Sequence, residues 1–361
     1  MGAINEKAAY RGRVSGRVSG PGCWASDRGD SAGCVSSGAS ASGVCGSPES
    51  VQGGRLASGQ SDLGCARSAG AARMRTADGA VTQAPSLHRK KMGERVRQEK
   101  GSQGMKTAVV ANQKGGVGKT ATSIHLAFDA LERGKRLVFI DLDPQENASD
   151  SLESFACGLT ASALFNADVD LRGALGAALE QDGPCIVLIA ADPALANLEK
   201  KELGEVGANF KNSIKALAEL GFDLCLIDTA PTIGNALAAA LYASDYVLSP
   251  IEPERYSIKG IKKMNAAIAN IRKANPGLKF LGMVPSMVDG RNPRHKQHLD
   301  ELKAAYPQLM IPAPIGLRGS IADALAMGVP VWQIKKTAAR VAAKEVRALA
   351  QYVYEKMEIA Q

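Results

Sequence analysis

Residues 107–120 read TAVVANQKGGVGKT. A run of small and β-branched apolar residues passes directly into a glycine-rich loop, and from residue 119 the sequence has a helical period. Glycines let consecutive backbone N–H groups turn toward a phosphate, and the start of a helix adds partial positive charge there. This stretch therefore predicts a strand, a phosphate-binding loop and a helix, in that order.

The loop differs by one residue from the ordinary P-loop pattern GxxxxGK[ST]. That pattern requires glycine at position 113, where this chain has Gln113. The chain instead matches KGGxGK[ST], which carries a second lysine, Lys114, at the start of the loop. We expect Lys119 to reach the β- and γ-phosphates of a nucleotide and the Thr120 hydroxyl to ligate Mg²⁺. The residues expected to line the nucleotide are Lys114, Gly115, Gly116, Val117, Gly118, Lys119, Thr120 and Ala121.

Two carboxylates follow the next expected strand, at 137–141. Asp141 and Asp143 stand at positions i and i+2, and so on one side of an extended backbone. Because two anions beside a triphosphate would repel it, they indicate a bound Mg²⁺ or a water molecule to be oriented. An Asp-Pro turn after a strand is the alternative explanation.

Two more polar segments follow apolar runs later in the chain. Asp228 ends the run at 222–228, about 110 residues after the loop, which is the Walker B arrangement that holds Mg²⁺ directly or through water. The segment at 248–257 reads LSPIEPERYS and again follows a strand-like run. A proline-rich turn from strand to helix would explain that segment equally well.

Strand-like and helix-like segments alternate from residue 105 onward. The expected strands are 107–111, 137–141, 185–190, 223–228, 246–250, 280–284 and 310–314. The expected helices are 119–133, 209–220, 234–243, 257–274, 293–305, 320–327 and 338–356. This order predicts an α/β fold with a doubly wound, mostly parallel sheet, in which ligands bind beyond the carboxyl ends of the strands.

Residues 1–104 have a different composition from the rest of the chain. They hold 15 of the 44 basic residues, 8 of the 36 acidic residues and 19 of the 38 glycines, with few large apolar side chains. Such a segment buries too little apolar surface to offset its conformational entropy, so we expect a disordered leader over 1–104. Met105 is either an internal translation start or a methionine that follows an ordinary linker.

The composition also excludes several classes of protein. No apolar stretch approaches the roughly 20 residues that span a bilayer, and the first residues lack the apolar core of a secretory signal. None of the seven cysteines forms a CxxC pair, so we expect neither a zinc site nor a disulfide framework and infer a cytoplasmic, reducing compartment. We assign no role to His125, His295 or His298.

The motifs together resemble the ParA family of partition ATPases, which shares this deviant Walker A loop with MinD and the nitrogenase iron proteins. Residues 141–147 are similar to the family pattern DxDPQxN, although Glu146 stands where the family commonly has glycine or alanine. Residues 228–231 resemble DTPP, with Ala230 as a departure. The resemblance spans about 105–358, and its opening and closing segments are similar to the IncC group within the family.

The resemblance implies roles for single residues. It makes 105–361 a ParA-like P-loop ATPase domain that uses ATP and Mg²⁺. Lys114 would cross an ATP-sandwiched dimer to the partner's nucleotide, and Asp143 would position or activate the hydrolytic water. Asp141 would support the metal region. The residues expected beside the adenine are Pro250, Ile251 and Glu252.

A basic segment follows residues 318–331, which resemble a late segment of ParA proteins. In that family, basic residues of this region contact DNA phosphates without reading sequence, which gives steep salt dependence. The candidate DNA contacts are Arg318, Lys335, Lys336, Arg340, Lys344 and Arg347. Helical spacing would place the last four on one face, and a solvated helix face is the alternative.

The function implied by the resemblance is plasmid partition. ATP would bridge a homodimer that binds DNA nonspecifically on the nucleoid, and a ParB-like centromere-binding protein would stimulate hydrolysis and release, without stable membrane association. Three alternatives stay open. A MinD-like membrane-cycling ATPase needs an amphipathic C-terminal helix, a nucleotide-responsive DNA-binding repressor needs an N-terminal helix-turn-helix, and a redox iron protein needs cysteines beyond Cys225.

Overall fold

The computed structural model describes residues 104–180, 183–254 and 257–359. The expected leader at 1–104 lies outside the described residues except for its last position, so its disorder and its boundary stay predictions. Among the helices that the structure describes, none is long and apolar enough to cross a membrane.

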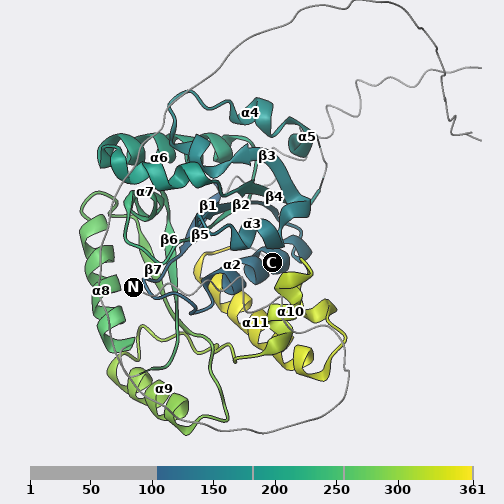
Figure 1. The fold of residues 1–361 in the computed structure, drawn as a ribbon, viewed down its shortest axis with the longest axis vertical. Coiled ribbons are helices and arrows are strands. Elements are labelled where there is room, and N and C mark those ends of the chain that lie inside the picture. Colours follow the sequence, from purple (N-terminus) through teal and green to yellow (C-terminus); the bar gives the residue numbers. More distant parts are fainter. Residues whose placement is uncertain (1–103, 181–182, 255–256, 360–361) are drawn as a thin grey trace, which may run out of the picture. The chain divides into compact units, whose positions relative to one another are not determined.

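A parallel sheet of seven strands forms the centre of the fold, in the order β3-β4-β2-β5-β1-β6-β7 (Figure 1). Every strand pairing is parallel, which confirms the predicted fold class. The strands are β1 (Lys106–Val110), β2 (Arg136–Leu142), β3 (Ala156–Thr160), β4 (Cys185–Ala190), β5 (Leu224–Thr229), β6 (Tyr246–Ile251) and β7 (Lys279–Pro285).

Helices fill the connections between these strands. The α-helices are α2 (Lys119–Glu132), α3 (Asn147–Ser151), α4 (Leu171–Ala174), α5 (Gly176–Leu179), α6 (Leu203–Glu219), α7 (Asn235–Ala243), α8 (Ser257–Ile271), α9 (Pro293–Ala305), α10 (Gly319–Ala326) and α11 (Thr337–Lys356). Short 3₁₀ segments are η2 (Glu153–Phe155), η3 (Ala161–Phe165), η4 (Pro193–Lys200) and η5 (Val331–Gln333).

Both faces of the sheet are covered, because successive side chains of a strand point to opposite faces. Val109 and Val138 belong to the core under α6, α7 and α8. Val110 and Phe139 belong to the core under α2, α10 and α11. All four are fully buried, and full burial of such a side chain stabilises the fold by about 1.5–3 kcal/mol. This double burial explains why the strands read as unbroken apolar runs.

The sequence predictions did not include the short helices α3, α4 and α5, and three further elements differ from them. The expected strand at 310–314 is wrong: Met310 forms an isolated bridge with Met283, and Pro312 and Pro314 have no N–H to continue a ladder. Strand β3 has no counterpart among the expected strands, because its side chains alternate between exposed and half-buried at the edge of the sheet. Helix α6 begins six residues before the expected 209, where the Glu202 carboxylate accepts the N–H of Glu205 at 2.9 Å.

Candidate active site

The glycine-rich loop connects β1 to α2 in the expected place. Gly116 and Gly118 adopt φ angles of 74° and 83°, a left-handed conformation that favours glycine. A Cβ atom at Gly118 would lie 2.7 Å from the Ser286 hydroxyl oxygen, so a side chain has no room there. The Gln113 side-chain nitrogen is buried without a hydrogen-bond partner among the described residues. The loop thus offers turned backbone and an unpaired donor, which fits a phosphate-binding role.

Lys119 begins α2 and extends back toward the loop. Its ammonium donates a 3.4 Å hydrogen bond to the Lys114 carbonyl, and the residue is only 7% exposed. Burial lowers the pKa of Lys119, while the charges of Asp228 and Asp143 act in the opposite direction. A buried ammonium with one long hydrogen bond retains donors for an anion. Lys119 is therefore well placed for the phosphate role that the sequence predicts.

The first turn of α2 is joined to the end of β5 through Asp228. The hydroxyls of Thr120 and Ser123 donate to the two carboxylate oxygens of Asp228 at 2.7 and 2.8 Å. Burial, followed by the charge of Asp141, raises the pKa of Asp228 to about 7. Ser123 is a site residue that the motifs do not single out. The sequence did offer a signal for Ser123, because it follows Thr120 by about one turn of the expected helix.

Strand pairing places Asp141 opposite Asp228 on the neighbouring strand. Asp141 accepts the N–H of Asp143 at 3.0 Å, and the N–H and hydroxyl of Ser149 each at 2.8 Å. Burial raises the pKa of Asp141 to about 6. With its oxygens engaged in this way, Asp141 organises the loop that carries Asp143, and its role in supporting the metal region stays a prediction.

The loop after Asp143 contains the family departure at Glu146. Glu146 has a φ angle of 59° and precedes α3, where its side chain makes no cap hydrogen bond. A non-glycine residue in this left-handed region costs about 1–2 kcal/mol. Glycine, one of the two residues that the resemblance implies for this position, adopts this conformation without that cost. Asp143 itself is 8% exposed and accepts the N–H of Gln145 at 3.0 Å.

Lys114 stands at the start of the phosphate loop, in a different environment from Lys119. Its side chain is 45% exposed, and its ammonium pairs with Glu252 at 2.7 Å and Glu254 at 2.6 Å. Asn112, which the sequence motifs do not reveal, accepts the Lys114 N–H at 2.9 Å and donates to the Pro250 carbonyl at 2.7 Å. This polar residue directly after β1 therefore fixes the start of the loop against β6.

The residues expected beside the adenine lie at the end of β6 in different environments. Pro250 and Ile251 are buried within the strand, and Ile251 packs against Met283 and the apolar side of α9. Glu252 has a partly exposed side chain. The structure brings only Glu252 of the three into side-chain contact with the loop.

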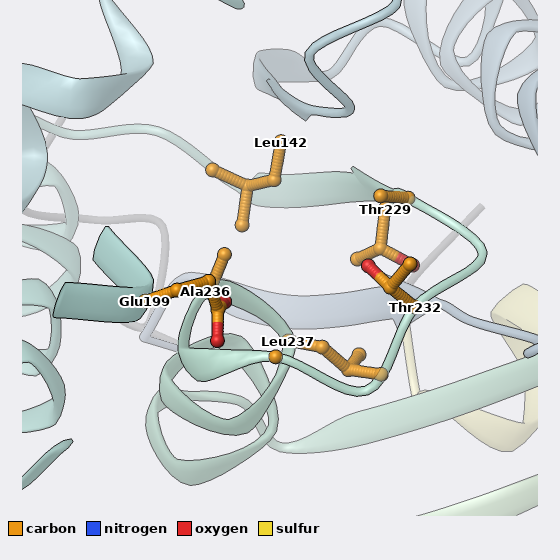
Figure 2. Close-up of a pocket in the computed structure, with 8 residues that line it drawn as sticks. Leu142, Glu199, Thr229, Thr232, Ala236 and Leu237 are labelled. Carbon is orange, nitrogen blue, oxygen red and sulfur yellow. The ribbon is translucent and has the colours of Figure 1, made fainter. Parts of the chain in front are cut away.

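A small pocket is lined in part by the segment that follows Asp228 (Figure 2). It has room for about one water molecule, 20 Å³. Its lining residues are Leu142, Glu199, Thr229, Ala230, Thr232, Gly234, Ala236 and Leu237. Glu199, another residue outside the sequence motifs, accepts the N–H of Asn235 at 2.7 Å and so caps α7. None of the phosphate-loop residues lines this pocket.

Three of the expected DNA contacts are paired within the chain. Arg318 donates to Glu345 at 2.9 Å, and Lys336 pairs with Asp323 at 2.6 Å. Arg347 turns toward α2 and is engaged there by acidic side chains. The remaining three, Lys335, Arg340 and Lys344, are exposed and make no ion pair within the part of the chain that the structure describes.

Arg347 ties α11 to α2. It pairs with the fully buried Asp129 at 2.9 Å and with Glu132, and its guanidinium lies 4.0 Å from the centroid of the Trp332 ring. His125 connects α2 to η5, because its Nε2 accepts the Val331 N–H at 3.3 Å and its Nδ1 then donates to the Ala121 carbonyl. Burial lowers the pKa of His125 to about 4, so it is a neutral core residue.

The other two histidines lie on α9. His295 accepts the N–H of Asp289 at 3.3 Å, and His298 contacts Glu301 at 3.2 Å. Both contacts are local to this helix and its preceding loop, far along the chain from the phosphate loop.

A parallel β-sheet covered by helices, with this loop between β1 and α2, defines a P-loop ATPase of the deviant Walker A class. A family model described as an AAA domain matches residues 105–280. Protein IncC of Escherichia coli is 55% identical over 364 aligned positions, which cover all of both chains. Chromosome partitioning protein ParA of Caulobacter vibrioides is 30% identical over 234 positions, 63% of this chain and 86% of that protein. The chain therefore belongs to the ParA family of partition ATPases, and it resembles IncC over its whole length.

Solved structures agree on the fold. A plasmid partition protein from Borrelia burgdorferi bound to AMPPNP has a TM-score of 0.57 at 22% identity, covering 70% of this chain and 99% of that one. Cobyrinic acid a,c-diamide synthase from Mycobacterium smegmatis, with bound ADP and magnesium, has a TM-score of 0.55 at 25% identity, covering 71% and 97%.

Proposed function

We propose that this ATPase separates plasmids by pairing two subunits around ATP, binding DNA in the paired state and releasing it on hydrolysis. One observation carries the proposal. The two lysines of a single loop occupy different environments: Lys119 is buried beside Asp228, whereas Lys114 is exposed at the mouth of the loop. In this proposal one cation serves the phosphates of its own subunit, and the other acts on the nucleotide of a second subunit.

The donor set fits a nucleotide with Mg²⁺. Thr120 and Asp228 supply the hard oxygen ligands that Mg²⁺ prefers, and phosphate oxygens complete such sites. When bound, Mg²⁺ neutralises charge on the phosphates. Lys119 binds and orients the same phosphates, and Asp143 holds the attacking water. Asp141 keeps Asp143 in position through the 3.0 Å hydrogen bond to its N–H.

Nonspecific DNA binding is assigned to the exposed side of α11. Arg340 and Lys344 stand one turn apart there, opposite the buried face that contains Ala339, Ala342 and Val346. Two adjacent cations suffice to contact phosphates, and they read no sequence. A ParB-like centromere-binding protein stimulates hydrolysis in this scheme, and the protein works in the cytoplasm, on the nucleoid when ATP is bound.

The alternatives have less support. The apolar side of α11, with Leu349, Val353 and Tyr354, packs against the sheet, which accounts for the amphipathic pattern without a membrane. A nucleotide-responsive repressor needs a helix-turn-helix within 1–104, and that segment lies outside the described residues except for its last position. The iron protein needs late cysteines, and the sequence has none beyond Cys225.

Sedimentation of the full chain tests the proposal. The protein is run without nucleotide, with ADP and with ATP, each with and without a nonspecific duplex. We expect a dimer with ATP alone and a larger complex when the duplex is added. A single species that is unchanged by ATP contradicts the proposal.

A further inference from the structure

Lys114 is held by two carboxylates of its own chain. Its ammonium lies 2.7 Å from Glu252 and 2.6 Å from Glu254, residues that follow it by 138 and 140 positions. A cation that acts on a second subunit has to leave this arrangement first. The intrachain pairing therefore competes with the role proposed for Lys114.

The turn that carries the two carboxylates is built to present them together. The Ser257 hydroxyl donates to the Glu252 carbonyl at 2.5 Å and accepts the Glu254 N–H at 3.1 Å. The Ser257 N–H donates to the Glu254 carbonyl at 3.0 Å. These bonds connect the backbone of Glu252 and of Glu254 to Ser257, so less conformational entropy opposes the contact with Lys114 than in an ordinary surface ion pair.

The loop side of the contact is fixed as well. Asn112 accepts the Lys114 N–H and donates to the Pro250 carbonyl, two residues before Glu252. Burial lowers the pKa of Lys114, but hydrogen bonds and charge from Glu252 and Glu254 outweigh it, so the net shift is upward. The ammonium is thus charged and engaged in the free subunit.

We propose that Glu252 and Glu254 form a cis latch, which holds Lys114 in the unpaired subunit and gives way only when a partner's nucleotide phosphates replace them. The proposal rests on the proposed function, because it assumes that Lys114 acts on the partner's nucleotide. In this proposal Glu254 is a positioning residue, which affects pairing of the subunits through Lys114. The latch sets how much ATP is needed for pairing.

The test uses Glu254→Gln, since Glu252 is also a candidate neighbour of the base. The matched control is Glu219→Gln, which removes the same charge at the exposed end of α6, before the amino end of β5 and so at the end of the strands opposite the phosphate loop. In nucleotide-free full-length protein, acetylation of Lys114 is measured by mass spectrometry relative to the exposed Lys273. We expect Glu254→Gln to raise the relative rate at Lys114 several-fold and Glu219→Gln to leave it unchanged.

Pairing is then measured by sedimentation across a range of AMPPNP concentrations. A partly exposed ion pair of this kind predicts that Glu254→Gln lowers the midpoint for dimerisation about two- to fivefold. If the acetylation rate at Lys114 is unchanged in Glu254→Gln, Glu254 does not hold Lys114. If the rate rises but the AMPPNP midpoint for dimerisation is unchanged, the contact does not restrain pairing and the latch is wrong.

Lys114→Ala separates the latch from the proposed function. If Lys114→Ala dimerises with the parent midpoint, the trans role of Lys114 fails, and the proposed function and the latch fail with it. If Lys114→Ala no longer dimerises while Glu254→Gln behaves as the parent, only the latch is wrong.

Discussion

The hydroxyl of Thr120 lies 2.7 Å from a carboxylate oxygen of Asp228 and joins the start of α2 to the end of β5. The two residues are 108 positions apart, and Ser123 holds the other carboxylate oxygen. The two residues expected to hold Mg²⁺ are therefore in contact within the chain alone. Asp228 is fully buried, and burial raises its pKa to about 7, although the hydrogen bonds from Thr120 and Ser123 act in the opposite direction.

Asp228→Asn is expected to stabilise the nucleotide-free protein at high pH. The folded-state pKa near 7 lies above the ordinary value of 3.8, so the folded chain holds a proton that the unfolded chain releases. This contribution to stability is therefore complete below about pH 4 and is lost as pH rises toward 7 and above. At pH 8 the variant should gain on the order of 4 kcal/mol over the parent, with no gain at pH 4.

Thermal unfolding at pH 4, 6 and 8 checks the Asp228→Asn expectation. The control is Asp300→Asn, an exposed change on α9 that should follow the parent at every pH. An Asp228→Asn protein whose stability parallels the parent across this range contradicts the raised pKa.

Lys119→Ala should strongly weaken ATP binding. The ammonium is the buried cation of the loop, and a charged hydrogen bond to a phosphate contributes about 1.5–3 kcal/mol, so affinity should fall about 10- to 100-fold or more. Titration calorimetry with ATP measures the decrease. Lys215→Ala, an exposed lysine on α6, is the control. Unchanged affinity in Lys119→Ala removes the phosphate role.

Asp143→Ala should stop turnover and leave pairing intact. The side chain is assigned to the attacking water and not to the phosphates, so ATP still binds and the dimer accumulates. Phosphate release and sedimentation are measured on the same sample. Asp150→Ala, an exposed change on α3, controls for general effects on this segment. Hydrolysis at the parent rate in Asp143→Ala would rule out the assignment.

Arg340→Ala combined with Lys344→Ala should weaken binding to all duplexes alike. Removing one cation from a DNA phosphate lowers the slope of log affinity against log salt by about 1, so the double variant lowers it by about 2. Binding is measured with two unrelated duplexes at several salt concentrations. Lys215→Ala combined with Lys273→Ala, both exposed on the other side of the sheet, is the control. Weaker binding to only one of the duplexes would indicate base readout instead.

Arg347→Lys should destabilise the fold although it keeps the charge. A lysine side chain cannot pair with both Asp129 and Glu132 while stacking on the Trp332 ring, so the contact between α2 and α11 weakens. We expect a decrease of about 1–2 kcal/mol in unfolding free energy, since Arg133 still pairs with Asp129. Urea unfolding measures it, with Arg340→Lys as control. Equal stability of the parent and Arg347→Lys would show that this arginine has no structural role.

Local sequence was sufficient for much of the fold. The alternation of apolar runs and helical segments predicted six of the strands, because double burial leaves an unbroken apolar signature in the chain. It failed at 310–314, where the prolines interrupt hydrogen bonding, and at β3, whose edge position leaves half of its side chains in solvent. The two prolines were a signal against a strand that the apolar pattern outweighed, whereas the edge position of β3 is not encoded in its own sequence.

What the sequence by itself determined is the phosphate loop and the carboxylates that follow strands. Their geometry depends on backbone conformation over a few residues, as the left-handed φ angles of Gly116 and Gly118 illustrate. Only the tertiary structure decided which strands are neighbours, and with that the burial of Asp228 beside Asp141, which together raise the pKa of Asp228. It also decided which cations are engaged: Lys114 and Arg347 meet partners more than 100 positions away. Charge neutralisation depends on distance in space, and spacing along the chain does not encode that distance.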